Sequence, residues 1–189
     1  MANILFVNAD EQRTQALIVA MATARPTDHF RLTTMHPHDI DAALRRRFEV
    51  LVGSASDGLF MAEALDGIEA VYMSGDVAAV RNLHGMTWAL NNFERPAQRV
   101  VLTNTAITDT TVTPLKMDRM AVLAALQASR LAFVFVQQIP ARLEKRLLVE
   151  TVDTRSRIMR QVVETRRWTE MVAKLLLPTI AESEVGIAN

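Results

Sequence analysis

Short apolar runs alternate with amphipathic segments along most of the chain. The apolar runs have the length of buried strands, and the segments between them repeat apolar residues at helical spacing. Strands are predicted over residues 3–7, 29–35, 48–52, 68–73, 98–103 and 131–137. Helices are predicted over residues 11–24, 40–47, 59–65, 77–92 and 114–129. Strands that alternate with helices predict an α/β fold (α+β), with a largely parallel or mixed sheet.

The chain after Pro140 has a different pattern. Apolar residues recur at helical spacing, and helices are predicted over residues 141–152 and 155–177, the second of them closed by Pro178. We therefore predict an α/β core over residues 1–140 and a helical C-terminal extension over residues 141–189, packed on the core.

Composition excludes several classes of protein. Half of the 189 residues are hydrophobic, so the chain can build a core, and its formal net charge is zero, so any contact with nucleic acid must use a local patch. Because there is no cysteine, disulfide scaffolds and thiolate metal sites are excluded. The apolar runs are shorter than the roughly 20 residues of a spanning helix. We expect a soluble cytoplasmic protein with at most a peripheral contact with the inner membrane.

The polar turn GSASDG, residues 53–58, joins a predicted strand to a predicted helix. Backbone N–H groups at such a junction bind phosphate readily. The turn lacks the lysine of a P-loop and is not a GxGxxG pattern. Helix capping by a serine or aspartate is the alternative interpretation. The candidate phosphate-binding residues are Gly53, Ser54, Ser56 and Gly58, and Asp57 is a candidate metal ligand or catalytic group.

A second turn, Ser74-Gly75-Asp76, also follows a predicted strand directly. Arg81, in the helix after this turn, is positioned to approach a phosphate, and His84 is a candidate acid or base. Asp76 and Glu63 are carboxylates that together with Asp57 suit a divalent cation. Simple capping and surface charge are the alternatives.

Two basic segments are candidate anion-binding surfaces. The first precedes the strand at residues 48–52 and consists of Arg45, Arg46 and Arg47, for which a solvated helix end is the alternative. The second lies on the predicted C-terminal helix, beside an apolar face, and suits DNA, anionic lipid or a partner protein. Its candidate DNA-binding residues are Arg155, Arg157, Arg160, Arg166 and Arg167.

The unit FEVLVGSASDGLFMAEALDGIEAVYM, residues 48–73, resembles the centre of the ParB/sulfiredoxin fold. That family has a strand, a glycine, a polar phosphate-binding box, a helix and a second strand, and its box carries an arginine where this chain has Ser54 to Asp57. Within that fold, the chain resembles the Osa family of plasmid-encoded fertility-inhibition (oncogenic suppression) proteins.

This resemblance implies an ATP-hydrolysing, metal-dependent DNase. The enzyme would degrade DNA bound for a type IV secretion or conjugation channel and so block transfer of a rival plasmid or T-DNA. ATP and Mg²⁺, or another divalent cation, would be its cofactors, and transfer-intermediate DNA and channel components its partners. Asp57 and Asp76 would hold the metal, Glu63 would be an accessory carboxylate, and Arg81 and Arg46 would stabilise charge.

A competing resemblance is to the ParA/MinD-type partition ATPases. ILFVNADEQ, residues 4–12, is similar to their second strand with its acidic box, and residues 43–57 lie where their Walker B strand would. The chain has no G-K-[ST] sequence. This alternative therefore implies a non-enzymatic binding or regulatory module.

Overall fold

The computed structural model describes residues 1–75, 79–92, 99–104, 124, 133–139, 146–152, 158–164, 172–173 and 175–176. Within these described residues, eight strands form one sheet. They are β1 (Asn3–Val7), β2 (His29–Thr34), β3 (Glu49–Val52), β4 (Ala70–Gly75), β5 (Arg99–Asn104), β6 (Phe133–Ile139), β7 (Arg146–Val152) and β8 (Ile158–Glu164). The helices are α1 (Gln12–Ala24), α2 (Ala42–Arg47), α3 (Gly58–Ala64) and α4 (Ala79–Asn92), with a 3₁₀ turn at Pro37–Asp39.

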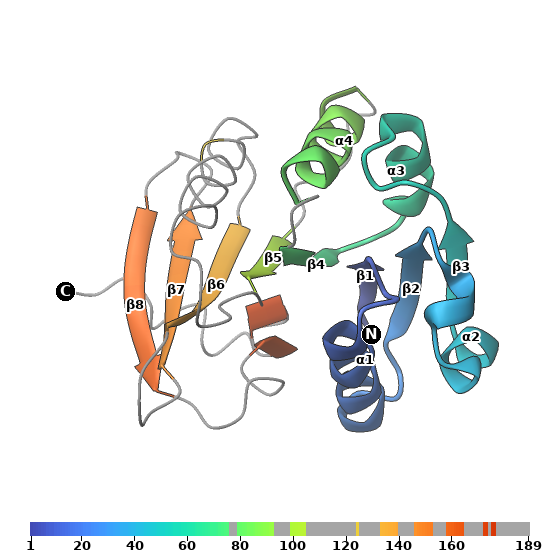
Figure 1. Ribbon diagram of the computed structural model, residues 1–189, viewed down its shortest axis with the longest axis horizontal. Coiled ribbons are helices and arrows are strands. Elements are labelled where there is room, and N and C mark those ends of the chain that lie inside the picture. Colours follow the sequence, from blue (N-terminus) through green and yellow to red (C-terminus); the bar gives the residue numbers. More distant parts are fainter. Residues whose placement is uncertain are drawn as a thin grey trace.

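The strands lie in the order β3-β2-β1-β4-β5-β6-β7-β8 (Figure 1). The first six in this order are parallel, and β7 and β8 add to the β6 side in antiparallel pairing. The chain runs outward from β1 to β3 and then returns to place β4 on the other side of β1. The connections that leave the carboxyl ends of β1 and β4 therefore diverge, which opens a crevice at that edge of the sheet.

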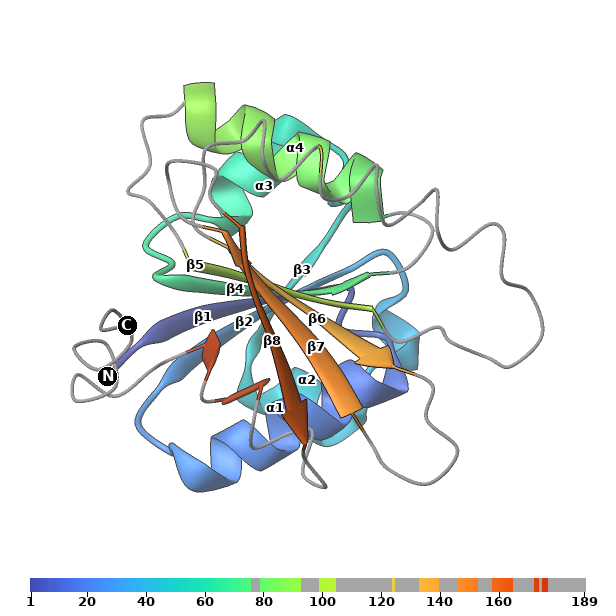
Figure 2. The same cartoon turned by 90° about the vertical axis from the view of Figure 1, so that its left-hand side faces the viewer.

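Helices cover both faces of the parallel strands: α1 and α2 lie on one face, and α3 and α4 on the other (Figure 2). Alternate residues of β1 serve the two layers. Ile4 and Phe6 pack in the cluster that contains α1, whereas Leu5 and Val7 pack in the cluster that contains α3 and α4. A parallel strand buried on both faces reads as a continuous apolar run, which is the pattern of this segment.

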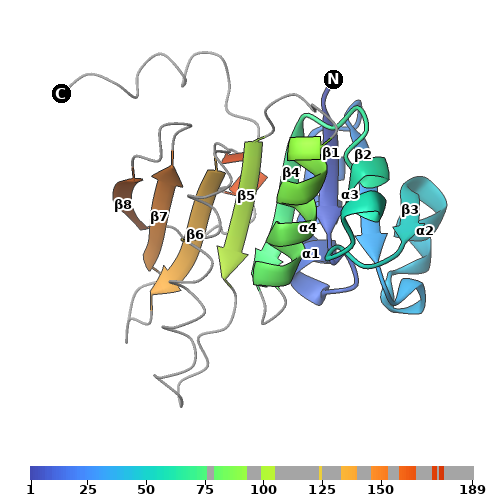
Figure 3. The same cartoon turned by 90° about the horizontal axis from the view of Figure 1, so that it is seen from above.

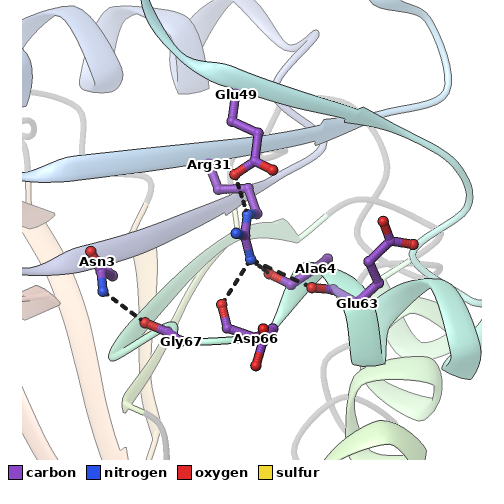
Figure 4. Close-up of polar contacts among 7 residues, drawn as sticks. All are labelled: Asn3, Arg31, Glu49, Glu63, Ala64, Asp66 and Gly67. Carbon is purple, nitrogen blue, oxygen red and sulfur yellow. Dashed lines mark hydrogen bonds and ion pairs between the residues drawn. The ribbon is translucent and has the colours of Figure 1, made fainter.

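Arg31 of β2 connects three parts of the fold (Figure 4). Its Nη1 donates hydrogen bonds to the backbone oxygens of Ala64 and Asp66, at 3.0 and 2.8 Å, at the end of α3. Its Nε donates to Glu49 Oε2 of β3 at 2.6 Å. A guanidinium suits this position because the last carbonyl groups of a helix lack partners within the helix and carry partial negative charge.

The elements predicted before residue 104 are confirmed, with small differences at their ends. After Pro140, residues 172–173 and 175–176 are helical as predicted, whereas the predicted helices are wrong over residues 146–152 and 158–164, which are strands. Their valines and isoleucine favour strands, and pairing with β6 outweighs the helical spacing. The helical C-terminal extension is corrected to that extent, and the boundary at residue 140 stays a prediction. Over the described residues, no helix is sufficiently long and apolar to span a bilayer.

The close packing of α4 on the β3–α3 connection depends on Gly85. A Cβ atom at this position would lie 2.3 Å from the Ala55 backbone oxygen and 2.8 Å from the Ser56 carbonyl carbon. These obstacles are backbone atoms, which cannot rotate aside. A side chain at position 85 must therefore push the helix away from residues 55–56.

We expect Gly85→Ala to lower the free energy of unfolding by about 1–3 kcal/mol, the usual cost of overpacking. Helix propensity alone predicts a gain of about 1 kcal/mol, so the sign of the change separates the two effects. Urea unfolding measures it, with the exposed Asn91→Ala in the same helix as the control. A Gly85→Ala protein as stable as Asn91→Ala would contradict the packing argument.

Candidate functional site

A cleft of about 480 Å³ lies at the carboxyl edge of the parallel sheet. It forms where the connections after β1, β2 and β3 meet the first turn of α4. Figure 3, seen from the α3 and α4 side, shows these helices over the β4-β1-β2 part of the sheet. The lining residues are Asn8, Asp10, Glu11, Met35, His36, Ser54, Ala55, Ser56, Arg81 and Asn82.

The β1–α1 connection forms its turn without glycine. Asn8 takes the left-handed conformation, with φ of 57°, which asparagine tolerates better than most residues. The Ala9 N–H donates to the Thr33 backbone oxygen at 2.9 Å, which ties the turn to β2. Glu11 is the N-cap residue of α1, and its side chain makes no capping hydrogen bond within this described turn. Glu11, the residue directly before α1, lines the cleft.

Asp10 reaches across to the end of the neighbouring strand. The hydroxyl of Thr34, the last residue of β2, donates to Asp10 Oδ1 at 2.9 Å. The same hydroxyl accepts the backbone N–H of His36 at 2.8 Å. A carboxylate has about four lone-pair sites, so Asp10 keeps acceptor capacity for a ligand. The structure thus holds a carboxylate in the cleft at the carboxyl end of β2.

The β3–α3 connection supplies the hydroxyl groups of the cleft. Ser54 and Ser56 lie with their Oγ atoms 2.8 Å apart, and the Ser56 N–H donates to Ser54 Oγ at 3.3 Å. Asp57, by contrast, caps α3: its Oδ1 accepts the N–H groups of Leu59 and Phe60 at 2.9 and 3.4 Å. Asp57 lines a separate groove instead of the cleft.

The side chain of Tyr72, in β4, is fully buried, and its hydroxyl lies 2.9 Å from Thr103 Oγ1 of β5. Burial raises the pKa of Tyr72 above its ordinary value of 10.0, and the hydrogen bond with Thr103 opposes this only in part. Burial also lowers the pKa of Arg99. Tyr72 is the only tyrosine of the chain, so its ionisation can be followed without interference.

The residues predicted for catalysis and phosphate binding do not form one site. Ser54, Ser56 and Arg81 lie in the cleft, whereas Glu63 is exposed on α3. Gly53 and Gly58 have structural roles, because an added Cβ would clash with the rings of Phe60 and Trp88. His84 shares the groove of Asp57.

The three arginines at the end of α2 lie away from the cleft. Arg47 donates to the Ala22 backbone oxygen at 3.2 Å and stacks over the Phe48 ring. It lines a different pocket, with Asn3 and Phe30. Arg45 and Arg46 belong to the same last turn of α2, and none of the three lines the cleft.

One of the predicted DNA-binding residues, Arg160, lies in the strand β8. The other predicted site residues of this kind lie outside the described residues, as does one predicted metal ligand: Arg155, Arg157, Arg166 and Arg167, and Asp76. Their predicted roles stay predictions. In the part of the chain that the structure describes, no three His, Cys, Asp or Glu residues group as a metal site.

No protein-family model matches the sequence, and no curated protein matches it. Solved structures do match its fold. A Rossmann-fold NAD(P)-binding family protein from Shigella flexneri has a TM-score of 0.65 at 15% identity, over 93% of this chain and 86% of that one. A short-chain dehydrogenase/reductase from Veillonella parvula, in complex with NADP, has a TM-score of 0.61 at 15% identity, over 78% and 75%.

An NADPH-dependent quinone oxidoreductase from Escherichia coli, complexed with NADPH, also matches, with a TM-score of 0.58 at 15% identity over 70% of this chain and 48% of that one. Likeness at this identity establishes the fold. The chain has a Rossmann fold, in agreement with its strand order.

These comparisons correct the predicted family and function. The ParB/sulfiredoxin fold is wrong, as is membership of the Osa family, because the neighbours are Rossmann-fold proteins. The DNase and ATPase activities, the role in blocking conjugation and the ParA/MinD alternative are overturned with it. The neighbours are described with NADP or NADPH, and not with ATP and Mg²⁺, so that cofactor prediction is also wrong. The predicted DNA and channel partners stay predictions.

Sequence reasoning did not select Asn8 and Asp10 as site residues and placed them in the segment that is similar to the acidic box of the ParA/MinD-type ATPases. Both follow β1 directly, as Ser54 follows β3, and the carboxyl ends of parallel strands share one edge. Their position directly after a strand could have identified them. It indicates the cleft as soon as β1 is known to lie in the middle of the sheet.

We expect the phenol of native Tyr72 to stay protonated above pH 10.0, its ordinary pKa. Because the pKa is higher in the folded than in the unfolded protein, the free energy of unfolding does not change with this group's protonation below that pH. Above it, the unfolded phenol ionises first, and the free energy of unfolding falls by up to about 1.4 kcal/mol per pH unit. Ultraviolet absorbance of the phenolate, with unfolding at each pH, measures both effects.

Tyr72→Phe is the control. It should lose this alkaline slope and be less stable by about 1 kcal/mol at neutral pH, since Thr103 loses its partner. A phenolate signal at pH 10.0 from protein that is still folded would refute the assignment.

Proposed function

We propose that this chain binds the nucleoside part of an adenine nucleotide-type ligand in the cleft at the carboxyl edge of its sheet. The observation that carries the proposal is the Asp10 carboxylate, held at the end of β2 by the Thr34 hydroxyl. In Rossmann proteins that bind NAD, an acidic residue near this position accepts hydrogen bonds from the ribose hydroxyls. Here the acidic group comes from the β1–α1 connection.

Other groups support a nucleoside in the same cleft. Met35 is 61% exposed, which gives an apolar surface for a flat base at the end of β2. Ser54 and Ser56 offer hydroxyl groups, and the volume of about 480 Å³ lies in the range of small-molecule pockets, roughly 300–1,000 Å³. The neighbours described with NADP and NADPH bind ligands that contain adenosine.

The diphosphate of such a dinucleotide fits less well. In the Rossmann fingerprint, glycines after β1 let the backbone approach the diphosphate, which rests on the start of the next helix. This chain has no glycine before Gly53, and Asp10 and Glu11 line the cleft beside the start of α1. The turn after β1 therefore lacks the glycines by which the fingerprint holds the diphosphate of NAD(P).

An enzymatic role is consistent with the neighbours, which are described as a dehydrogenase/reductase and an oxidoreductase. Both of these enzymatic roles involve binding of a nucleoside. Nucleoside binding is also the function that the described residues of the cleft support. Peripheral contact with the inner membrane stays a prediction.

We expect adenosine to bind the protein and Asp10→Asn to weaken binding about 10- to 100-fold, the effect of losing a charged hydrogen-bond acceptor. Calorimetric titration measures the affinity, and a rise in melting temperature with ligand checks that the native state binds. The control is Asp39→Asn, which removes an exposed carboxylate that does not line the cleft. Absence of adenosine binding, or equal binding by both variants, would refute the proposal.

A further inference from the structure

We infer that the cleft selects a nucleoside whose 5′ substituent is uncharged or cationic over one that carries a diphosphate. The inference rests on the proposed function and defines the ligand class more closely. It concerns the side of the cleft that is lined by Asp10 and Glu11, the residues that directly precede α1.

The charge of the lining argues against a diphosphate. Among the described lining residues, Asp10 and Glu11 carry −2 and Arg81 carries +1, which leaves −1 if His36 is counted as neutral. Asp10 cannot readily leave the cleft, because Thr34 holds its carboxylate and Gln15 Nε2 donates to its backbone oxygen at 3.0 Å. A diphosphate here would lie beside carboxylates, and like charges at close range disfavour each other.

The start of α1 adds to the same preference. The first N–H groups of a helix attract anions, and α1 is long enough, at 13 residues, to have this property. Here Glu11 occupies the N-cap position and Asp10 precedes it, so two negatively charged residues stand directly before the helix and reduce its attraction for a further anion. What remains for a ligand is a partly enclosed site with negative charge.

The residues of the β1–α1 turn also disfavour a diphosphate. Glycine at the close-approach positions of a dinucleotide fingerprint lets phosphate oxygens reach the N–H groups. In this chain the corresponding turn contains Asn8, Ala9, Asp10 and Glu11, all of which carry side chains. Ala9 also uses its N–H on the Thr33 oxygen, so that donor is not available to a phosphate.

The test compares three probes that share adenosine and differ at the 5′ position. They are adenosine, 5′-amino-5′-deoxyadenosine as the cationic probe, and ADP-ribose as the diphosphate probe. For the wild-type protein, we expect affinity to fall in the order amino derivative, adenosine, ADP-ribose. Raising the salt concentration should reduce the differences in affinity among the three probes, because salt screens charge.

Glu11→Gln should raise the affinity for ADP-ribose relative to that for adenosine about tenfold, since it removes one like charge beside the diphosphate. Glu63→Gln, an exposed carboxylate outside the cleft, is the matched control and should change neither affinity. If Glu11→Gln folds poorly, Glu11→Asn removes the same charge and supplies a favoured N-cap residue.

ADP-ribose that binds the wild-type protein more tightly than adenosine, with a ratio unchanged by Glu11→Gln, would overturn the inference and leave the proposed function standing. If none of the three probes binds the wild-type protein, the proposed function fails and this inference fails with it.

Discussion

The arrangement of the molecule depends on the pairing of β1 with β2 on one side and with β4 on the other. Both pairs are parallel, so the two strands beside β1 begin and end at the same edges as β1 itself. The chain can satisfy both pairs only by returning from β3 at the edge to the middle of the sheet. The cleft is a geometric result of that return. The strand β1, which pairs on both sides, is also buried on both faces.

The same pairing explains how an unusual β1–α1 turn is kept in place. A left-handed Asn8 is less favourable than glycine, yet the turn is fixed on both sides: β1 precedes it, and hydrogen bonds from Ala9 and to Asp10 tie it to the end of β2. The turn thus follows β1, as the fingerprint turn of a dinucleotide-binding protein does, while its residues are different. Fold and ligand class can separate in this way because the backbone path and the side chains on it are set by different interactions.

Much of the local structure is predictable from the sequence, and the reason is local pattern. The strand at Asn3–Val7 and the helix that ends before Pro26 are each specified by apolar spacing and by their end signals. Residues 158–164 show where this fails. Apolar residues repeat there at helical spacing: Ile158, Met159, Val162 and Val163. The segment is a strand because it pairs with β7, an interaction that the spacing within the segment does not encode.

The cleft was harder to predict for the same reason. Ser54, Ser56 and Arg81 were candidates because each lies near the end of a strand or the start of a helix. Asp10 became significant only when the sheet order brought it to Thr34 of β2, which no spacing along the chain encodes. The choice of a wrong family had a related cause, since a strand, turn, helix and strand recur in many α/β folds.

The contacts of Arg31 give the two ends of α3 separate tasks. Its carboxyl end is fastened to β2 and β3 through one guanidinium, while its amino end follows directly from the serines that line the cleft. The helix has seven residues, so about two turns separate these ends. The placement of the serine hydroxyls is therefore set in part from the opposite edge of the sheet, by a side chain that does not line the cleft.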